Sequence, residues 1–527
     1  MTRRMLALIL GCCLAFAACG GSDDDTPAAG GGSDTTEGGG QEEEEPEEGA
    51  LDETAVFRYA YSVDPISMDP HKASRGFDNI MLTPVYDRLI HVTSETELVP
   101  GLATEWELTD TSLTLTLREG VKFSDGTPFD AAAVKANLDR AKALEGSIVA
   151  PLLTSVANVV VEDPTTVVLE LSAPNSSLPA ILSDKAGMMI SPAALDNPDL
   201  DRMPVGAGMF EVVEYVPGNI IRYEPVEDYW DPDAVKVAGL EILLMPDETA
   251  RLNAVRTGEV DATWLNAPML AEAEAAGLKV DATPGASYVS IVMDRSQPPF
   301  DDPRVREAMN LAVDREAILE GIFFGVGEPT VQIFPEKSPY YNADYPASYF
   351  ERDVERAKEL LTEAGYPDGF SYEQIVANVA PYPQVVEALQ AQLAEAGITL
   401  TPRMVSAQES TDLFFRQSQG QGFTVLWSAT NDPSVSIQRK FTGKGNSNRG
   451  AFSLPAMEEL YSSAVASTDE AERTELLQEI SGTVVEENLE IILLFTPKPI
   501  VYREGVVGFS IFATDHQEFR GVGVLAD

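Results

Sequence analysis

The chain has 527 residues, more than a single hydrophobic core accommodates, so we expect two or three lobes. Its 85 Asp and Glu outnumber 36 Lys and Arg, and a formal net charge of −49 excludes a surface that binds nucleic-acid phosphates. There are three histidines, and all three cysteines lie within the first 19 residues, so we expect no disulfide in the body, no metal site, no histidine-rich catalytic centre and no cofactor.

The N-terminus is typical of a secretory signal. Arg3 and Arg4 precede an apolar run from Met5 to Ala17, which is too short to span a bilayer stably as a helix. Phe16-Ala17-Ala18-Cys19 resembles the lipobox of bacterial lipoproteins, in which the cysteine is lipidated and becomes the first residue. We therefore expect a signal peptide over residues 1–18 and a lipid on Cys19; an ordinary signal peptide with an incidental cysteine is the alternative.

Residues 19–54 contain glycine runs and four consecutive glutamates but no Lys or Arg. Such a segment cannot bury enough apolar surface to fold, and its like charges keep it extended. We expect it to tether a folded body to the extracytoplasmic face of the cell membrane.

Alternating apolar residues predict the first strands of the body. Val56 to Tyr61 and Leu113 to Leu117 both alternate in this way, and Val121 to Phe123 predicts a further short strand. Asp130 is placed to cap a helix that begins directly after it.

Helices dominate the second half of the chain. We expect them after Asp302-Pro303, from about Asp353 to Ala364, around Val385 to Leu393, and around Leu476 to Val484. Short apolar strands follow two of them, at Ile398 to Leu400 and at Ile491 to Phe495. Helices that alternate with short strands predict an α/β architecture with partly parallel sheets.

Seven segments, in order along the chain, resemble motifs of family 5 of the extracellular solute-binding proteins, the peptide/nickel-type binding proteins of bacterial ABC importers. They are Ser67 to His71, Tyr86 to Leu89, Leu98 to Trp106, Leu117 to Pro128, Asp228 to Trp230, Arg256 to Asp261 and Pro299 to Arg306. Leu117 to Pro128 is the most specific of them.

The resemblance implies the periplasmic-binding-protein type II fold, a two-lobe clamp with an additional domain. By this analogy lobe I comprises residues 55–86, 205–290 and 490–527, the additional domain 87–204, and lobe II 291–489. The chain then crosses between the lobes near Ser290 and near Leu489. Two crossings form a hinge, on which the clamp closes over its ligand.

The sequence favours binding over catalysis. It holds no G-x-S-x-G, H-E-x-x-H, P-loop or dinucleotide-binding fingerprint, so we expect no catalytic residue. A binding cleft needs aromatic walls and a few polar anchors. The resemblance places such residues at Arg75, Phe77, Trp264, Asn266, Tyr288, Trp427, Asn431 and Asp432. The alternatives are that Trp264 belongs to the core and that the loop of Arg75 and Phe77 is merely solvated.

In peptide-binding members of this family, an Asp in the segment that matches Trp427 to Pro433 pairs with the amino terminus of the ligand. Here its place falls on Ala429 or Thr430, and Asp432 matches a turn residue. The sequence therefore leaves open whether a free amino terminus is recognised, with Asp432 as the remaining carboxylate. Arg416 either meets a ligand carboxylate or lies on the surface.

We therefore expect a monomeric, lipid-anchored binding protein that delivers a small solute to an ABC permease and ATPase complex. A peptide is the leading ligand class. An oligosaccharide or another small solute is the alternative within this function, and a secreted hydrolase is the alternative of another class.

Replacing Cys19 tests the anchor. Cys19→Ser is expected to release the protein from the membrane fraction, because the acyl chain has lost its attachment point, while the body stays folded. Mass spectrometry of the wild-type N-terminal peptide detects the acyl chain directly. A wild-type chain without it contradicts the anchor and leaves the secretory signal untouched.

Overall fold

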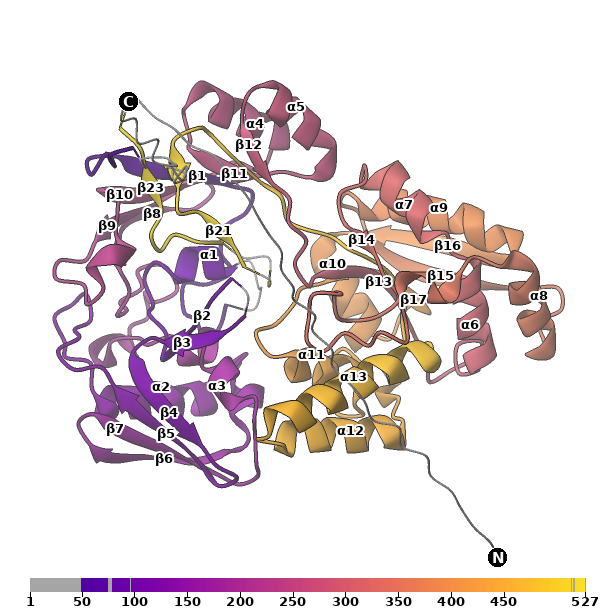
Figure 1. Ribbon diagram of the computed structural model, residues 1–527, viewed down its shortest axis with the longest axis horizontal. Coiled ribbons are helices and arrows are strands. Elements are labelled where there is room, and N and C mark those ends of the chain that lie inside the picture. Colours follow the sequence, from indigo (N-terminus) through magenta and orange to yellow (C-terminus); the bar gives the residue numbers. More distant parts are fainter. Residues whose placement is uncertain (1–48, 74–77, 95, 513, 515–516, 527) are drawn as a thin grey trace, which may run out of the picture. The chain divides into compact units, whose positions relative to one another are not determined.

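The computed structural model describes residues 49–527 apart from 74–77, 95, 513, 515–516 and 527, and three larger β-sheets organise this part of the chain (Figure 1). Helices pack on these sheets, so the predicted α/β class is confirmed. Within the described ranges, no helix is both long enough and apolar enough to cross a membrane.

The first sheet has seven strands: β1 (Val56–Tyr61), β8 (Phe210–Val216), β9 (Ile220–Pro225), β10 (Gly239–Leu244), β11 (Ala262–Trp264), β12 (Lys279–Asp281) and β19 (Ile500–Tyr502). Their order is β12-β19-β11-β1-β10-β9-β8, and β1 runs parallel to both of its neighbours. Phe57 and Tyr59 of β1 pack against Phe509 and Phe519, so aromatic contacts hold the end of the chain on this sheet. Helix α4 (Glu248–Thr257) contacts β1, β11 and β19, and helix α5 (Leu270–Ala275) contacts the edge strand β12.

The second sheet has six strands: β13 (Tyr288–Met293), β14 (Glu328–Pro329), β15 (Phe370–Ala377), β16 (Ile398–Val405), β17 (Gly422–Trp427) and β18 (Ile491–Phe495). Their order is β14-β18-β13-β17-β15-β16, and β15 is parallel to β16 and β17.

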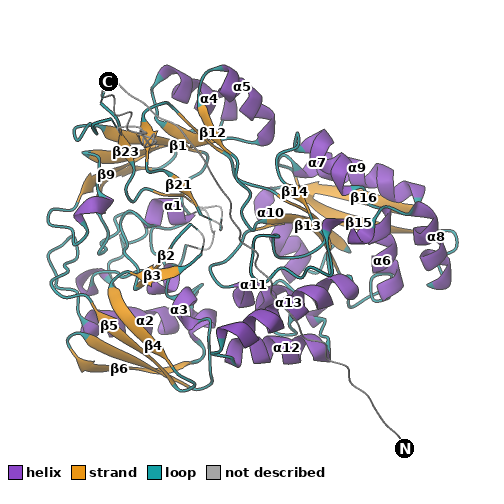
Figure 2. Ribbon diagram, viewed as in Figure 1, coloured by secondary structure: helices purple, strands orange, loops and turns teal. Residues whose placement is uncertain are grey.

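Eight helices belong to the same stretch of chain: α6 (Pro303–Ala312), α7 (Arg315–Ile322), α8 (Val354–Glu363), α9 (Tyr382–Glu395), α10 (Ala407–Thr411), α11 (Pro433–Phe441), α12 (Pro455–Ala466) and α13 (Glu470–Glu486) (Figure 2). The four predicted helices are confirmed as α6, α8, α9 and α13. Asp302 caps α6 as expected, since its carboxylate accepts from the Arg304 backbone N–H.

The chain passes between these two sheets twice, within residues 282–287 and 496–499. The two passages lie side by side, because the Thr496 backbone N–H donates to the Ser287 carbonyl at 3.1 Å. Both lie a few residues from the crossings expected near Ser290 and Leu489. The shift arises because the apolar run that forms β18 pairs with β13 and so stays in the six-stranded sheet.

The third sheet has four antiparallel strands, β4 (Ala103–Leu108), β5 (Ser112–Leu117), β6 (Val156–Asp163) and β7 (Thr166–Leu171), in the order β4-β5-β7-β6. Helix α2 (Ala131–Ala143) packs against β6 and β7, and Asp130 caps it as predicted. The strand predicted over Val121 to Phe123 is wrong. Only a single bridge forms there, between Lys122 and Pro128, because the chain reverses at once in a tight turn. In this turn the Gly126 N–H donates to the Phe123 carbonyl and the Phe123 N–H donates to the Thr127 carbonyl.

The described chain also has several shorter elements. They are the helices α1 (Asn79–Leu82) and α3 (Leu178–Ile181) and the strand pairs β2 (Ile90–Val92) with β3 (Leu98–Pro100), β20 (Val506–Val507) with β23 (Gly523–Val524), and β21 (Ser510–Ile511) with β22 (Gln517–Glu518).

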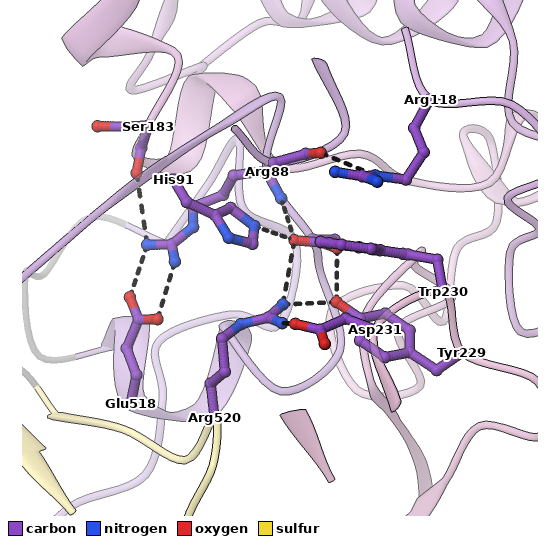
Figure 3. A network of polar contacts seen from close by, with 11 residues as sticks. Arg88, His91, Arg118, Ser183, Tyr229, Trp230, Asp231, Glu518 and Arg520 are labelled. Carbon is purple, nitrogen blue, oxygen red and sulfur yellow. Dashed lines mark hydrogen bonds and ion pairs between the residues drawn. The ribbon is translucent and has the colours of Figure 1, made fainter. Parts of the chain in front are cut away.

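A buried carboxylate, Asp87, joins three distant segments of the chain. Its oxygens accept from Tyr229 Oη and Trp230 Nε1, each at 2.6 Å, and contact His91 Nε2. The Arg520 guanidinium lies 3.7 Å away and donates to Tyr229 Oη at 2.5 Å. Figure 3 shows the side chains of His91, Tyr229, Trp230 and Arg520 converging. Burial alone would raise the pKa of Asp87, but His91, Arg520 and Tyr229 outweigh it and hold the pKa well below its ordinary value.

The neighbouring Arg88 makes a second buried pair. Its guanidinium donates to both carboxylate oxygens of Glu518, at 2.6 and 2.8 Å, and to the Ser183 carbonyl at 3.4 Å (Figure 3). A bidentate arginine–carboxylate pair fixes both orientation and distance. The C-terminal segment is thereby attached to the residues around α3.

Asp87→Asn is expected to lower the free energy of unfolding by about 3–5 kcal/mol, because the buried network loses the carboxylate that accepts from Tyr229 and Trp230 and faces Arg520, which keeps only its pair with Asp231. Since the pKa of Asp87 is lowered in the folded state, its ionisation stabilises the fold above pH ~4, and this stabilisation is lost as the pH falls further. Denaturant unfolding of both proteins at pH 7 and pH 3 measures the difference, which should shrink at the lower pH.

Asp139→Asn is the matched control, because Asp139 forms an exposed pair with Lys135 on α2. It should cost less than ~1 kcal/mol. Equal effects of the two substitutions would show that the Asp87 network adds nothing beyond a surface pair.

Candidate ligand-binding site

Six of the eight candidate ligand contacts lie in the part of the chain that the structure describes. Arg75 and Phe77 lie outside the described residues, as does Cys19. The six form two groups, one on each of the larger sheets. Trp264 and Asn266 lie at the end of β11, whereas Tyr288 lies on β13, Trp427 at the end of β17, and Asn431 and Asp432 just after β17. Each sheet therefore contributes one tryptophan.

Trp264 is half-buried at the end of β11, beside Tyr61 at the end of β1. Two cations lie on its ring: the Arg251 guanidinium at 4.8 Å and the Lys498 ammonium at 5.0 Å from the ring centre. Arg251 is buried and also donates to the Trp264 carbonyl at 3.3 Å. These contacts hold the indole in one orientation, so that its exposed part forms a rigid aromatic surface.

Asn266 is engaged within the protein. Its backbone N–H and its Nδ2 both donate to the carboxylate of Glu248, the first residue of α4, with Nδ2 at 3.0 Å. This pair fixes the loop that follows Trp264. The structure therefore gives Asn266 a positioning role beside the tryptophan.

Tyr288 and Trp427 are direct cross-strand partners on β13 and β17. Lys440 of α11 places its ammonium 4.6 Å from the Tyr288 ring centre and 5.2 Å from that of Trp427, and it donates to Tyr288 Oη. Tyr288 Oη in turn donates to Glu490 at 3.2 Å. Tyr288 is only 3% exposed, so it supports Trp427 and presents no surface of its own.

Burial governs the two charged groups of this network. It lowers the pKa of Lys440 to about 8 and raises the pKa of Glu490, while the opposite charge of each partner counteracts both shifts. Lys440 and Glu490 are each 3% exposed. They neutralise each other inside the protein and are not available to a ligand.

Asn431 and Asp432 are also occupied by protein partners. Asn431 Nδ2 donates to the carbonyl and the hydroxyl of Ser183, at 3.3 and 2.9 Å. Asp432 caps α11 by accepting from the Ser434 backbone N–H at 2.9 Å, and its other oxygen accepts from Arg473 at 2.6 Å. The carboxylate of Asp432 is thus used for structure, in agreement with the turn role that the resemblance implied.

The remaining residues of this segment offer no carboxylate. The Ala429 backbone N–H donates to Ser287 Oγ at 3.1 Å, and Thr430 Oγ1 donates to the Asp432 carbonyl at 2.6 Å. Arg416 has a side chain that is 86% exposed and pairs with Asp412, which places it on the surface. Among the described residues, no cluster of three His, Cys, Asp or Glu is arranged to hold a metal ion.

Sequence analysis missed the cations that lie on the two tryptophans. Lys498 is one of twelve lysines. It lies between Pro497 and Pro499, which restrict the backbone, and this local feature distinguishes it from the other lysines. Lys440 and Arg251 lie on the buried faces of α11 and α4, three residues after Ile437 and four residues before Val255. Their spacing places them among apolar residues, but it does not show which rings they contact, because those rings lie on other elements.

Asp432→Ala is expected to lower the free energy of unfolding of the ligand-free protein by about 3 kcal/mol, because α11 loses its cap and Arg473 loses its partner. Chemical denaturation measures this. Asp412→Ala, at the exposed pair with Arg416, is the control and should cost less than ~1 kcal/mol. A variant as stable as wild type that no longer binds amine-bearing ligands would instead assign Asp432 to the ligand.

Comparison with known proteins identifies the family. Residues 97–449 match the bacterial extracellular solute-binding proteins, family 5, in their middle region. The chain is 30% identical to the glutathione-binding protein GsiB of Escherichia coli strain K12 over 464 residues, which cover 84% of this chain and 90% of that protein.

Solved structures share the fold. The periplasmic binding protein DppA from Helicobacter pylori, in complex with the peptide STSA, has a TM-score of 0.79 at 22% identity, covering 90% of this chain and 98% of its own. The binding protein AgaA from A. tumefacien R10, in complex with agropinic acid, has the same score and identity over 90% and 99% of the two chains. The predicted fold is confirmed. The chain belongs to family 5 of the bacterial extracellular solute-binding proteins, the non-enzymatic substrate-binding components of ABC importers.

Proposed function

We propose that this protein captures short peptides and delivers them to an ABC permease. The observation that carries the proposal is the 30% identity, over most of both chains, to a protein named for binding glutathione, a tripeptide. A peptide bound to the H. pylori protein of the same fold is in line with this ligand class.

The two tryptophans supply the ligand surface in this proposal. Trp264 and Trp427 are half-buried, come from different sheets, and are each held in place by a cation on the ring. A solute enclosed between the two sheets would meet one rigid aromatic surface from each side. Backbone hydrogen bonds to an extended peptide would then supply most of the affinity, and side chains of many kinds would be tolerated.

A carboxylate partner for the free amine of the ligand is not part of this proposal. Positions 429 and 430 are Ala and Thr, and Asp432 is occupied by Arg473 and by the α11 backbone. The same aromatic surfaces favour an oligosaccharide as the second candidate, since sugars stack on indole rings. Both candidates require the same closure of two lobes, joined through residues 282–287 and 496–499.

We further propose that the lipid on Cys19 and the acidic segment over residues 19–54 hold this binding protein at the outer face of the cell membrane. The signal-like N-terminus and the lipobox resemblance support this location. An anchored binding protein stays close to the permease that it serves.

Titration calorimetry and solution scattering with a ligand panel test the function. S-methylglutathione, its N-acetyl derivative, a dipeptide and a neutral trisaccharide form the panel. The true ligand should reduce the radius of gyration, and at 100 times its Kd it should add ~2.7 kcal/mol to the stability of the native state. Acetylation of the amine should change the affinity by less than ~1 kcal/mol, because no carboxylate receives it.

Trp427→Ala provides the site-specific arm of this experiment. It should weaken binding by about 2 kcal/mol or more, the range of a buried aromatic anchor. Trp106→Ala is the control, because Trp106 is half-buried on β4, in the four-stranded sheet. If the trisaccharide binds and no peptide does, the ligand class is an oligosaccharide and the peptide assignment is wrong. If a ligand binds without reducing the radius of gyration, the proposed closure of the two lobes is contradicted.

A further inference from the structure

Helix α11 carries a guanidinium that has no partner in the protein. Arg439 is exposed, and its side chain makes no hydrogen bond, ion pair or ring contact with the residues that the structure describes. Two other cations of this region are engaged, since Lys440 donates to Tyr288 and Arg473 donates to Asp432. In a chain with 85 acidic and 36 basic residues, an arginine without a carboxylate partner needs an explanation.

Protein atoms surround Arg439 although its side chain is exposed. Burial lowers the pKa of its guanidinium, and no carboxylate of the described chain acts to raise that pKa again. The group remains charged at neutral pH, because an arginine pKa starts above 12. An exposed cation that has lost part of its hydration is typical of a concave surface, where a bound anion regains the lost interactions.

The helix directs Arg439 away from the core of its own sheet. The residues of α11 that are buried share one face: Ser434, Ile437, Lys440 and Phe441. At about 100° per residue, Val435 and Arg439 lie one turn apart on the opposite face. Val435 packs against the hydrophobic cluster that contains α3 and the four-stranded sheet. Arg439 therefore lies one turn beyond a contact between α11 and that part of the chain.

This face of α11 adjoins the candidate ligand-binding site. Asn431, just before the helix, donates to the hydroxyl of Ser183 at 2.9 Å, and Trp427 ends the strand that leads into this segment. The next residue after Arg439 is Lys440, whose ammonium lies 5.2 Å from the ring centre of Trp427. An extended tripeptide spans about 10 Å, so a peptide in contact with Trp427 can bring a carboxylate to Arg439.

We propose that the guanidinium of Arg439 binds a carboxylate of the transported solute and makes the protein selective for acidic ligands. This inference rests on the proposed function and deepens it, because it names the chemical class that the site selects. A planar guanidinium donates two parallel hydrogen bonds to one carboxylate, which fixes the orientation of the ligand as well as its charge. Lys440 does not serve this purpose, since it is 3% exposed.

The preference is expected to be large enough to measure. A hydrogen bond to a charged group in a partly desolvated site corresponds to about 10- to 100-fold in affinity. Because the chain carries a net charge of −49, no general attraction for anions contributes, and a preference for the acid over its ester must come from a local cation.

The test compares an acid with its own ester in each protein, by titration calorimetry at 0.15 M salt. The pairs are S-methylglutathione with its diethyl ester, and trigalacturonate with its methyl ester. Wild type should bind the acid of the accepted pair about 10- to 100-fold more tightly than the ester. Arg439→Gln should bring this ratio close to one, because the charge is lost. Arg439→Lys should keep part of the ratio, because the charge remains while the planar pair of donors is lost.

Arg416→Gln is the matched control, since Arg416 carries the same group in an exposed pair with Asp412. It should leave the ratio unchanged. Ligand-free Arg439→Gln should melt within about 2 °C of wild type, because no partner in the protein is lost. A large drop in Tm would show that the guanidinium is bonded within the protein, and it would overturn the proposal.

Three binding outcomes separate this inference from the proposed function. If the galacturonate pair binds with a ratio that depends on Arg439 and the peptide pair does not bind, the peptide assignment fails and the acidic subsite stands. If Arg439→Gln keeps the wild-type ratio, the subsite is overturned while peptide binding stands. A wild type that binds neither acid, or that prefers the esters, also overturns the subsite.

Discussion

The Asp87 carboxylate constrains how the rest of the chain is assembled. A buried charge is costly unless it is paired and hydrogen-bonded, and here the partners come from segments more than 100 residues away, at Tyr229, Trp230 and Arg520. Two of the motifs that carry the family resemblance, Tyr86 to Leu89 and Asp228 to Trp230, thus meet in one network. Their joint presence has a physical reason, because neither motif can satisfy its buried polar groups without the other.

The same network leads toward the candidate site. Arg88, next to Asp87, donates to the Ser183 carbonyl, and Ser183 accepts from Asn431 on the far side. A few residues along, Ser177 contacts Ser434, and the Ser176 backbone N–H donates to the Val465 carbonyl at 2.8 Å. The segment after Trp427 is therefore fixed both by α11 and by the residues around α3. Any movement of the six-stranded sheet away from α3 has to break these polar contacts. Their free energy therefore contributes to the equilibrium between open and closed forms.

Strands and helix caps that depend on residues close together in the sequence were predicted correctly. The strand Val56–Tyr61 has the predicted bounds, and the caps at Asp130 and Asp302 lie where the sequence placed them. The strand predicted over Val121 to Phe123 did not form, because residues that flank a tight turn can show the same apolar alternation as a strand. At the site, the sequence named both tryptophans. It did not show that Asn266, Tyr288 and Asp432 are engaged by protein partners, because each partner lies on another element.

Charge at the site and charge over the whole chain act over different distances. At 0.15 M salt the field of a surface charge is screened within about 8 Å, so the net charge of −49 has little effect on a ligand that is already bound. It does act on the approach of a ligand, and lowering the salt extends its reach. A solute with a net negative charge should then associate more slowly in dilute buffer, because the acidic protein repels it over a longer distance. A neutral solute would show no such dependence on salt.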